Sequence, residues 1–320
     1  MRRLLATVLA TVLAASVVHC SSEGARETFD ELDGAVGSSS SGGSGASSGS
    51  IGIGSDGGIE DSGPQVCDED IDVVLVIDTS TTMLFVLDAL EDEFENVVTA
   101  ANGLKEGAHF GAVFFQDNGI LDTSGAESDG KVHLGHETLR SAFVTMRDEY
   151  TRGQVNPGDG PDGPNSNAMC EENSLDALHI AVTQFPWRAN AAHIVVVVTD
   201  DTFLEAPDNY GDDDGNGSIG AGERSYPAER TVPETVAALQ AAKVKVFSFT
   251  NTTAACGATR RLQQTDAMTY GWSKPYGNNA PFPEQTGGAN FALEAVARGD
   301  VHLDAAINDI VLAARCNGVN

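Results

Sequence analysis

The sequence contains few basic residues, and this shortage excludes one large class of partner. Lysine and arginine together number 18, against 47 aspartate and glutamate residues, so the formal net charge at pH 7 is −29. Proteins that bind nucleic acid rely on lysine and arginine to neutralise phosphates. We therefore expect no nucleic-acid partner, and we regard divalent cations and basic protein surfaces as better candidates.

Sequence motifs of catalysis are also lacking. The chain has no His-Glu-x-x-His metalloprotease motif and no glycine-rich phosphate-binding loop. We identify no pairing of a nucleophile with a base and no open catalytic metal motif. The expectation is therefore a protein that is not an enzyme.

The N-terminal apolar run is too short to cross a membrane. It covers residues 4–18, whereas a membrane-spanning helix needs about 20 residues. The run follows Arg2-Arg3 and precedes His19-Cys20, a pattern typical of a bacterial secretion signal. We therefore predict a signal peptide over residues 1–20 and a mature protein in the bacterial cell envelope or outside the cell.

The end of this signal resembles the lipobox of bacterial lipoproteins. Val17-Val18-His19 precedes Cys20, although His19 stands where glycine, alanine or serine is usual. The resemblance implies that Cys20 is lipidated and becomes the mature N-terminus, anchored to an envelope membrane. The alternative is cleavage by an ordinary signal peptidase, which would release the protein.

Residues 21–64 are predicted to form a flexible tether. They are rich in serine, glycine and acidic residues, a composition that cannot bury a core. Such a chain has a root-mean-square reach of about 35–40 Å, enough to hold a domain clear of a membrane. We place the folded domain at residues 65–320.

Two uninterrupted apolar runs predict the centre of a parallel sheet. IDVVLVID at 71–78 and HIVVVVTD at 193–200 read as strands that are buried on both faces. Further strands are expected at 109–116 and 244–250, with an edge partner at 131–134. Helices are expected at 83–104, 137–146, 172–185, 231–242 and 304–314. The alternation predicts an α/β fold, doubly wound, with a mostly parallel central sheet flanked by helices.

Three oxygen-bearing side chains follow the first of these strands. Asp78, Ser80 and Thr82 alternate along the chain, so their side chains are expected to turn the same way at the carboxyl edge of the sheet. One carboxylate and two hydroxyls form a hard donor set suited to Mg²⁺, Mn²⁺ or Ca²⁺. The alternative is an ordinary strand end followed by a helix N-cap.

This Asp-x-Ser-x-Thr pattern resembles the one that opens the metal-ion-dependent adhesion site of von Willebrand factor type A (vWA) domains. The resemblance extends over residues 67–316 through the order of strands and helices. It implies that Asp200, which ends the second apolar run, completes the metal site, often through a water. The alternatives for Asp200 are a helix N-cap or a solvated strand end.

The middle element of the site departs from the usual vWA pattern. CEENSLDAL at 170–178 is similar to the integrin β-subunit version, Pro-Glu-Gly-Gly-Phe-Asp-Ala, and that likeness implies that Glu172 is a ligand. Two alternatives remain open. Glu172 is a first-turn carboxylate favoured by the helix dipole, or Ser174 supplies a hydroxyl ligand instead.

The chain has only five cysteines, and Cys20 belongs to the signal. In an oxidising compartment, the other four suggest two disulfides with three possible pairings. The ends of a vWA domain lie close together, so the resemblance implies a Cys67–Cys316 disulfide, which leaves Cys170 to pair with Cys256. Four buried free thiols are the alternative. No Cys-x-x-Cys spacing favours zinc.

A second cation site is predicted at 212–223, DDDGNGSIGAGE. Asp212, Asp214, Asn216, the Ser218 carbonyl and Glu223 match ligand positions of an EF-hand loop for Ca²⁺, with Gly217 at the sharp turn. The flanking segments make poor helices, so we expect a lone loop inserted after Asp200. The alternative is an acidic loop that binds no ion.

For two other segments the sequence bears on whether their side chains are exposed or packed. The aromatic segment 270–283, with Trp272, Tyr276 and Phe282, is either an exposed recognition loop or a packed irregular segment. His133 and His136 are expected at the surface.

Together these features predict a protein that docks or adheres through a metal ion. A partner's acidic side chain would complete the metal's shell, and the N-terminal lipid would be the only membrane contact. The alternative is a structural component of an envelope assembly that calcium stabilises, with no ligand bridged by metal.

Overall fold

The computed structural model describes residues 69–160, 163, 171–211, 218–221, 224–251 and 269–316. All of these residues belong to one compact unit, Asp61–Asn320. The predictions for the signal peptide, Cys20 and the tether lie outside the described residues. The same is true of the cysteine side chains and of most of the calcium loop: Cys67, Cys170, Cys256, Cys316, Asp212, Asp214, Asn216 and Glu223.

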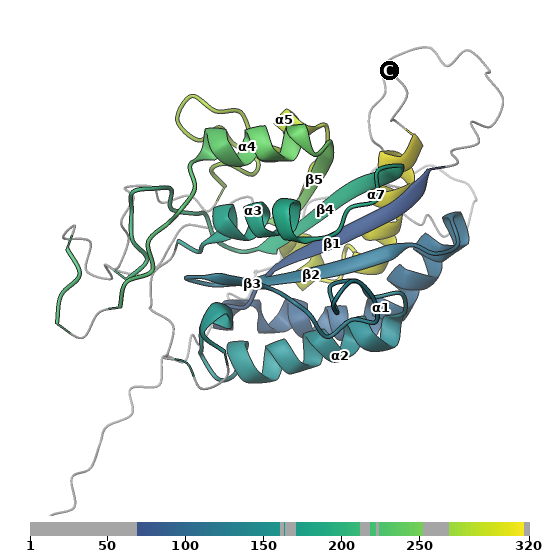
Figure 1. Cartoon of the computed structure of the whole chain (residues 1–320), viewed down its shortest axis with the longest axis horizontal. Helices are drawn as coiled ribbons and strands as arrows, with labels where there is room; N and C mark the ends of the chain where they lie inside the picture. The colour runs from purple at the N-terminus through teal and green to yellow at the C-terminus, as the bar shows by residue number, and fades with distance from the viewer. Residues whose placement is uncertain are drawn as a thin grey trace, which may run out of the picture. The chain divides into compact units, whose positions relative to one another are not determined.

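Six strands form one sheet in the order β3-β2-β1-β4-β5-β6 (Figure 1). All neighbouring pairs are parallel except β2 and β3, which are antiparallel. The strands are β1 (Asp70–Asp78), β2 (His109–Phe115), β3 (Gly119–Leu121), β4 (Ala191–Thr199), β5 (Val244–Thr250) and β6 (Asn290–Ala292). The predicted α/β class with a mostly parallel sheet is confirmed, and the order is that of a doubly wound fold.

The central strands carry long apolar runs, Val73–Ile77 in β1 and Ile194–Val198 in β4, because both of their faces are buried. In β1, Val73, Leu75 and Ile77 belong to one hydrophobic core, whereas Val74 and Val76 belong to a second core on the opposite face. Successive side chains of a strand point to opposite faces, so a sheet covered on both sides requires apolar residues at every position.

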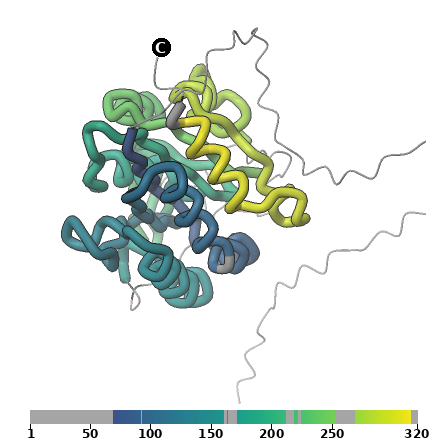
Figure 2. The backbone as a smooth tube through the Cα atoms, turned by 90° about the vertical axis from the view of Figure 1, so that its right-hand side faces the viewer, coloured from purple at the N-terminus to yellow at the C-terminus, as the bar shows by residue number. Residues whose placement is uncertain are grey.

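Helices cover both faces of the sheet (Figure 1). One side carries α1 (Leu84–Leu104), α2 (His136–Met146) and α7 (Leu303–Cys316), and the other carries α3 (Ser174–Gln184), α4 (Val232–Ala241) and α5 (Phe282–Thr286). Figure 2 shows α7 beside α1. There the backbone N–H of Asp304 donates to Glu93 Oε2 at 3.0 Å, and Asn96 Nδ2 donates to Asp304 Oδ2 at 2.9 Å.

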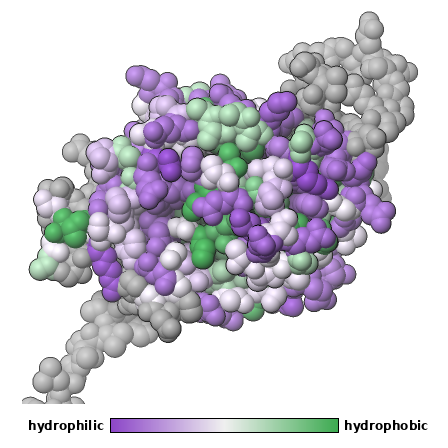
Figure 3. Space-filling model, in the orientation of Figure 1, coloured by the Kyte–Doolittle hydropathy of each residue, from purple (hydrophilic) through white to green (hydrophobic). Residues whose placement is uncertain are grey.

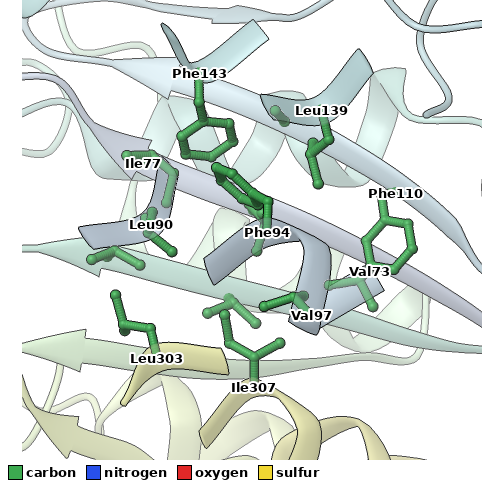
Figure 4. Close-up of a cluster of buried hydrophobic side chains, with 14 of the residues drawn as sticks. Val73, Ile77, Leu90, Phe94, Val97, Phe110, Leu139, Phe143, Leu303 and Ile307 are labelled. Atoms are coloured by element: carbon green, nitrogen blue, oxygen red, sulfur yellow. The ribbon is translucent and has the colours of Figure 1, made fainter. Parts of the chain in front are cut away.

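The larger core lies between β1, β2 and the helices α1, α2 and α7 (Figure 4). Phe94 of α1 meets Phe143 of α2 with ring centroids 4.2 Å apart, and Phe143 meets Phe114 of β2 edge-on at 5.0 Å. These contacts hold α1 and α2 against the sheet, and α1 begins a short distance after the end of β1.

The segment 131–134 pairs with β2 as expected, but at one position only. His133 and Phe110 exchange backbone hydrogen bonds of 2.8 and 3.0 Å, whereas the edge strand of the sheet is β3, which forms because the chain turns back immediately after β2. The expected surface position of His133 was wrong, because its side chain is fully buried. Its Nε2 lies 2.9 Å from Asp122 Oδ2, but its Nδ1 has no hydrogen-bond partner among the described residues.

The surface seen in the orientation of Figure 1 is largely hydrophilic, with small hydrophobic patches (Figure 3). Among the described helices, none has both the length and the apolar character required to cross a membrane.

The packing of α1 predicts that replacing two phenylalanines of that helix by alanine lowers the free energy of unfolding by very different amounts. Phe94 is fully buried, whereas Phe85 is 41% exposed. We expect Phe94→Ala to lower the free energy of unfolding by about 3–5 kcal/mol, because it leaves a cavity. Phe85→Ala should cost less than about 1 kcal/mol. Urea denaturation of both variants measures the difference, and equal losses would contradict the packing described.

Candidate metal centre

The site is built at the carboxyl ends of the two central strands. Asp78 is the last residue of β1, and its side chain is fully buried. Thr199, the last residue of β4, donates from Oγ1 to Asp78 Oδ2 at 2.7 Å, and the backbone N–H of Ser80 donates to Oδ1 at 2.7 Å. Both oxygens of the carboxylate are therefore held in a fixed orientation.

The two predicted hydroxyls connect Asp78 to the β4 side of the site. Ser80 Oγ lies 3.0 Å from Thr82 Oγ1, which donates to Asp200 Oδ1 at 3.1 Å. Ser80 precedes a short 3₁₀ turn, η1 (Thr81–Met83), but its side chain makes no capping hydrogen bond. Ser80 therefore occupies the N-cap position of this turn, while its hydroxyl lies next to that of Thr82, which bonds to Asp200.

Asp200 immediately follows β4 and does not cap a helix, because the next described helix, α4, begins at Val232 with Thr231 as its cap. Asp201 joins the site although the sequence analysis did not include it. One oxygen each from Asp78, Asp200 and Asp201 lies within 4.8 Å of the others. The Asp200-Asp201 doublet was the available signal.

Glu172 reaches the site from the segment before α3. The helix begins at Ser174 with Asn173 as its N-cap, so Glu172 precedes the cap and the first-turn alternative is wrong. Its backbone N–H donates to Thr202 O at 3.0 Å, and Tyr210 Oη donates to its carbonyl at 3.0 Å. These bonds fix the Glu172 backbone against the segment that follows β4.

The buried oxygens here are not all satisfied. Glu172 Oε2 and Ser174 Oγ are both buried and have no hydrogen-bond partner. A buried acceptor without a partner costs about 1–3 kcal/mol, and a charged one costs more. The choice between Glu172 and Ser174 as the third ligand therefore stays open, since both lack a partner.

Burial and mutual repulsion dominate the electrostatics. Burial, and then the charge of Asp200, raises the pKa of Asp78 from 3.8 to about 7. Burial likewise raises the pKa values of Glu172 and Asp201 well above their ordinary values, and it raises the pKa of Asp200. The charges that act on Glu172 all come from carboxylates: Asp78, Asp117, Asp201 and Asp200.

These residues fit a hard divalent cation. The donors are carboxylates and hydroxyls, the ligand types that Mg²⁺ and Ca²⁺ prefer. The unpartnered Glu172 Oε2 and the raised pKa values indicate negative charge that the surrounding groups leave uncompensated. A cation would stabilise the ionised form of each carboxylate.

The aromatic segment 270–283, which follows β5 in the chain, packs against the residues that follow β4. Trp272 is fully buried and donates from Nε1 to Asp201 O at 3.1 Å. Phe203 packs against both Trp272 and Phe282, with ring centroids 5.9 and 5.6 Å apart. Of the two alternatives for 270–283, the packed segment is therefore the correct one for these side chains.

The segment between β4 and α4 carries the predicted calcium loop on a paired stem. Tyr210 N donates to Tyr226 O at 2.8 Å, and Ala228 N donates to Asp208 O at 2.9 Å. Ser218 is exposed, and it is the one predicted ligand of this loop within the described residues. The stem also positions Tyr210, whose Oη donates a hydrogen bond to the Glu172 carbonyl.

Comparison with known proteins identifies no family: no family model matches, and no curated protein matches. Many solved structures are similar, and two of them illustrate the level of similarity. One is an aerotolerance-related membrane protein from Bacteroides fragilis NCTC 9343 with multiple mutations to serines (TM-score 0.39, 12% identity, 76% of this chain and 99% of that chain). The other is the pilus adhesin SpaC from Lactobacillus rhamnosus GG (TM-score 0.40, 13% identity, 77% of this chain).

The chain covers 31% of the adhesin, so it spans about a third of that protein's length. At these levels of similarity, the description of the fold rests on strand order and register.

The pKa of Asp78 predicts how the stability of the metal-free protein depends on pH. A folded-state pKa of about 7 against 3.8 means that the folded state holds this proton more tightly. The protonated Asp78 carboxyl therefore makes its full contribution to the free energy of unfolding below pH 3.8, and this contribution is lost as the pH rises through about 7. In EDTA, we expect the wild type to lose up to about 4 kcal/mol of unfolding free energy over this range.

Asp78→Asn should flatten this dependence, because the amide is neutral and still offers one acceptor to the Ser80 N–H. Asp129→Asn, at an exposed turn, is the matched control and should behave as wild type. Urea denaturation at a series of pH values provides the measurement. A wild-type protein whose unfolding free energy rises between about pH 5 and about pH 8 in EDTA would contradict the raised pKa of Asp78.

Proposed function

We propose that this chain carries a vWA domain whose site binds a divalent cation and, through it, an acidic side chain of a protein partner. The observation that carries the proposal is the cluster of Asp78, Asp200 and Asp201, with one oxygen of each within 4.8 Å of the others. The buried, unpartnered Glu172 Oε2 lies close enough for the charges of these aspartates to act on it. Like charges at such a place destabilise one another unless a cation compensates them. The class of protein follows from the Asp-x-Ser-x-Thr sequence at the end of a central strand.

Each residue has a distinct part in this proposal. Asp78 would hold the cation in the orientation that Thr199 and the Ser80 N–H impose. Ser80 and Thr82 would supply neutral oxygens, while Asp200, Asp201 and Glu172 would supply charge directly or through water. A bound Mg²⁺ keeps some of its waters, and a partner's aspartate or glutamate would replace one of them. The proposed function is binding, and the proposal assigns no chemical step to any residue of the site.

The proposal also includes a cellular location and a second ion-binding site. Export through the signal peptide and anchoring through Cys20 would place the domain at the cell envelope, carried on the 21–64 tether. The calcium loop, carried on the Tyr210 stem, would be a separate site. The rival function is a structural component that calcium stabilises and that needs no metal-bridged partner.

Calorimetric titration of the full chain with Mg²⁺ and Ca²⁺ tests the main site. We expect the wild type to bind a cation there, and Asp78→Ala to weaken this event by at least about tenfold, because the central carboxylate is removed. Asp201→Asn should weaken it less, since other carboxylates remain. Asp129→Asn is the control. Unchanged binding in Asp78→Ala would sink the proposal.

The partner is tested with an array of random peptides that contain aspartate or glutamate, beside matched peptides with asparagine or glutamine. We expect retention of acidic peptides only, lost in EDTA and lost in Asp78→Ala. If Asp78→Ala loses Mg²⁺ binding but the wild type retains no acidic peptide, the result favours the alternative of a structural component. Retention that persists in EDTA would refute metal bridging.

The calcium loop has its own variant, Asp212→Ala. If the loop binds Ca²⁺, this change removes a first-position ligand, so Ca²⁺ affinity and the rise in thermal stability with Ca²⁺ should both fall. The Mg²⁺ event of the main site should survive. Differential scanning calorimetry with and without Ca²⁺ measures the effect, and identical curves for variant and wild type would dismiss the loop as an ion site.

A further inference from the structure

The chain leaves the sheet at the acidic doublet Asp200-Asp201, and the backbone there is held by bonds from outside the strand ladder. The ladder between β4 and β5 ends at the pair of Thr199 and Thr250. The carbonyls that follow Thr199 therefore need other donors, because a buried carbonyl without a donor is costly. The residues that supply these donors decide where the backbone of the doublet lies.

Two side chains from beyond β5 donate to the carbonyls of the doublet. Asn251 directly follows β5 and donates from Nδ2 to Asp200 O at 2.9 Å. Trp272 donates from Nε1 to Asp201 O at 3.1 Å, and its side chain is fully buried. Both contacts are made to backbone oxygens, so they leave the two carboxylates of the doublet to the metal centre.

Further bonds hold the backbone on either side of these carbonyls. The Asp201 N–H donates to Thr199 Oγ1 at 3.1 Å, and this hydroxyl in turn donates to Asp78 Oδ2. The next carbonyl, that of Thr202, accepts from the Glu172 N–H at 3.0 Å. Three consecutive carbonyls are thus each held by a different segment of the chain.

The position of Asn251 follows from the register of the sheet. Because Thr199 pairs with Thr250, the next residues of the two strands, Asp200 and Asn251, lie side by side. The Asn251 side chain is half-buried, and its amide supplies the bond that a continuing ladder would have supplied. The ladder gives way to a side-chain donor at the residue whose carboxylate joins the metal centre.

Fixing these carbonyls also fixes the carboxylates of the doublet. One oxygen each from Asp200 and Asp201 lies within 4.8 Å of the other and of an Asp78 oxygen. The side chains that bind a metal must be held to within about 0.5 Å of the productive geometry. Losing an outer partner of a metal ligand typically lowers metal affinity by about 10–100-fold.

We propose that Asn251 and Trp272 are positioning residues of the metal centre, which orient the carboxylates of the doublet by holding its carbonyls. This inference rests on the proposed cation site. A rigid doublet favours Mg²⁺ over Ca²⁺, because Mg²⁺ demands near-ideal octahedral geometry whereas Ca²⁺ accepts a flexible shell. The alternative is that the two donors only satisfy buried carbonyls, which stabilises the fold without affecting the choice of cation.

The test replaces each donor by a side chain of similar shape. Asn251→Leu removes the amide, and Trp272→Phe removes the indole N–H but keeps an aromatic ring. Asn102→Leu is the matched control for the first. Asn102 is also half-buried, and its Nδ2 donates to Val98 O at 3.0 Å in the last part of α1, away from the metal centre.

Cation affinities are measured by calorimetric titration of the full chain with Mg²⁺. The Ca²⁺ affinity of the same site is obtained from the Ca²⁺ concentration that displaces Mg²⁺, so Ca²⁺ bound elsewhere does not enter. We expect Asn251→Leu and Trp272→Phe to lower Mg²⁺ affinity by at least about tenfold and Ca²⁺ affinity less. The ratio of the two affinities therefore falls, whereas Asn102→Leu should leave both affinities as in the wild type.

A second measurement needs no metal. The exchange rate of the Asp201 amide hydrogen in EDTA reports how firmly the doublet is held, because local opening exposes that hydrogen to solvent. We expect exchange at least about threefold faster in Asn251→Leu than in the wild type, and unchanged in Asn102→Leu. Asn251→Ala, which also lacks the amide, replaces the leucine variant if that variant does not fold.

The outcomes separate this inference from the proposed function. If Asp78→Ala loses Mg²⁺ binding but Asn251→Leu keeps the wild-type affinities and their ratio, only the positioning role is overturned. Equal losses in Asn251→Leu and Asn102→Leu, or an unchanged exchange rate at Asp201, would overturn it as well. A wild type that binds no Mg²⁺ would overturn both.

Discussion

The repulsion among Asp78, Glu172, Asp200 and Asp201 is the constraint on which the candidate site depends. Neighbouring parallel strands end at the same edge, so the last residues of β1 and β4 meet there. The Thr199 hydroxyl and the Ser80 N–H orient Asp78, but neither contributes a charge. The surrounding core, packed on both faces of the sheet, keeps water from screening the carboxylates. Ionising these carboxylates together is therefore costly in the folded chain, and a cation would offset that cost.

Sequence predicted the features that depend on long runs and regular periods. The apolar run of β1 and the spacing of Leu87, Leu90 and Phe94 along α1 each matched an element. Because parallel order follows from the alternation of strands and helices, the convergence of Asp78, Ser80, Thr82 and Asp200 could also be expected. Their identity as metal ligands remains a prediction.

The features that were missed depend on contacts between distant segments. β3 is only three residues long, Gly119–Leu121, and it forms because the chain reverses onto β2. His133 is buried because Asp122 lies beside it, which no local pattern indicates. Asp201 lies one residue beyond the Thr-Asp end of the family's pattern, so that pattern does not predict its place in the site.

The bond from the Trp272 indole to the Asp201 carbonyl gives the protein a built-in optical reporter. The chain has two tryptophans, and the other, Trp187, lies before the first residue of β4, packed against Phe185 and His193. The two indoles thus lie towards opposite ends of the same strand. We therefore expect the fluorescence of Trp272 to respond to the charge next to Asp201, and that of Trp187 to serve as a reference from the other end of the strand.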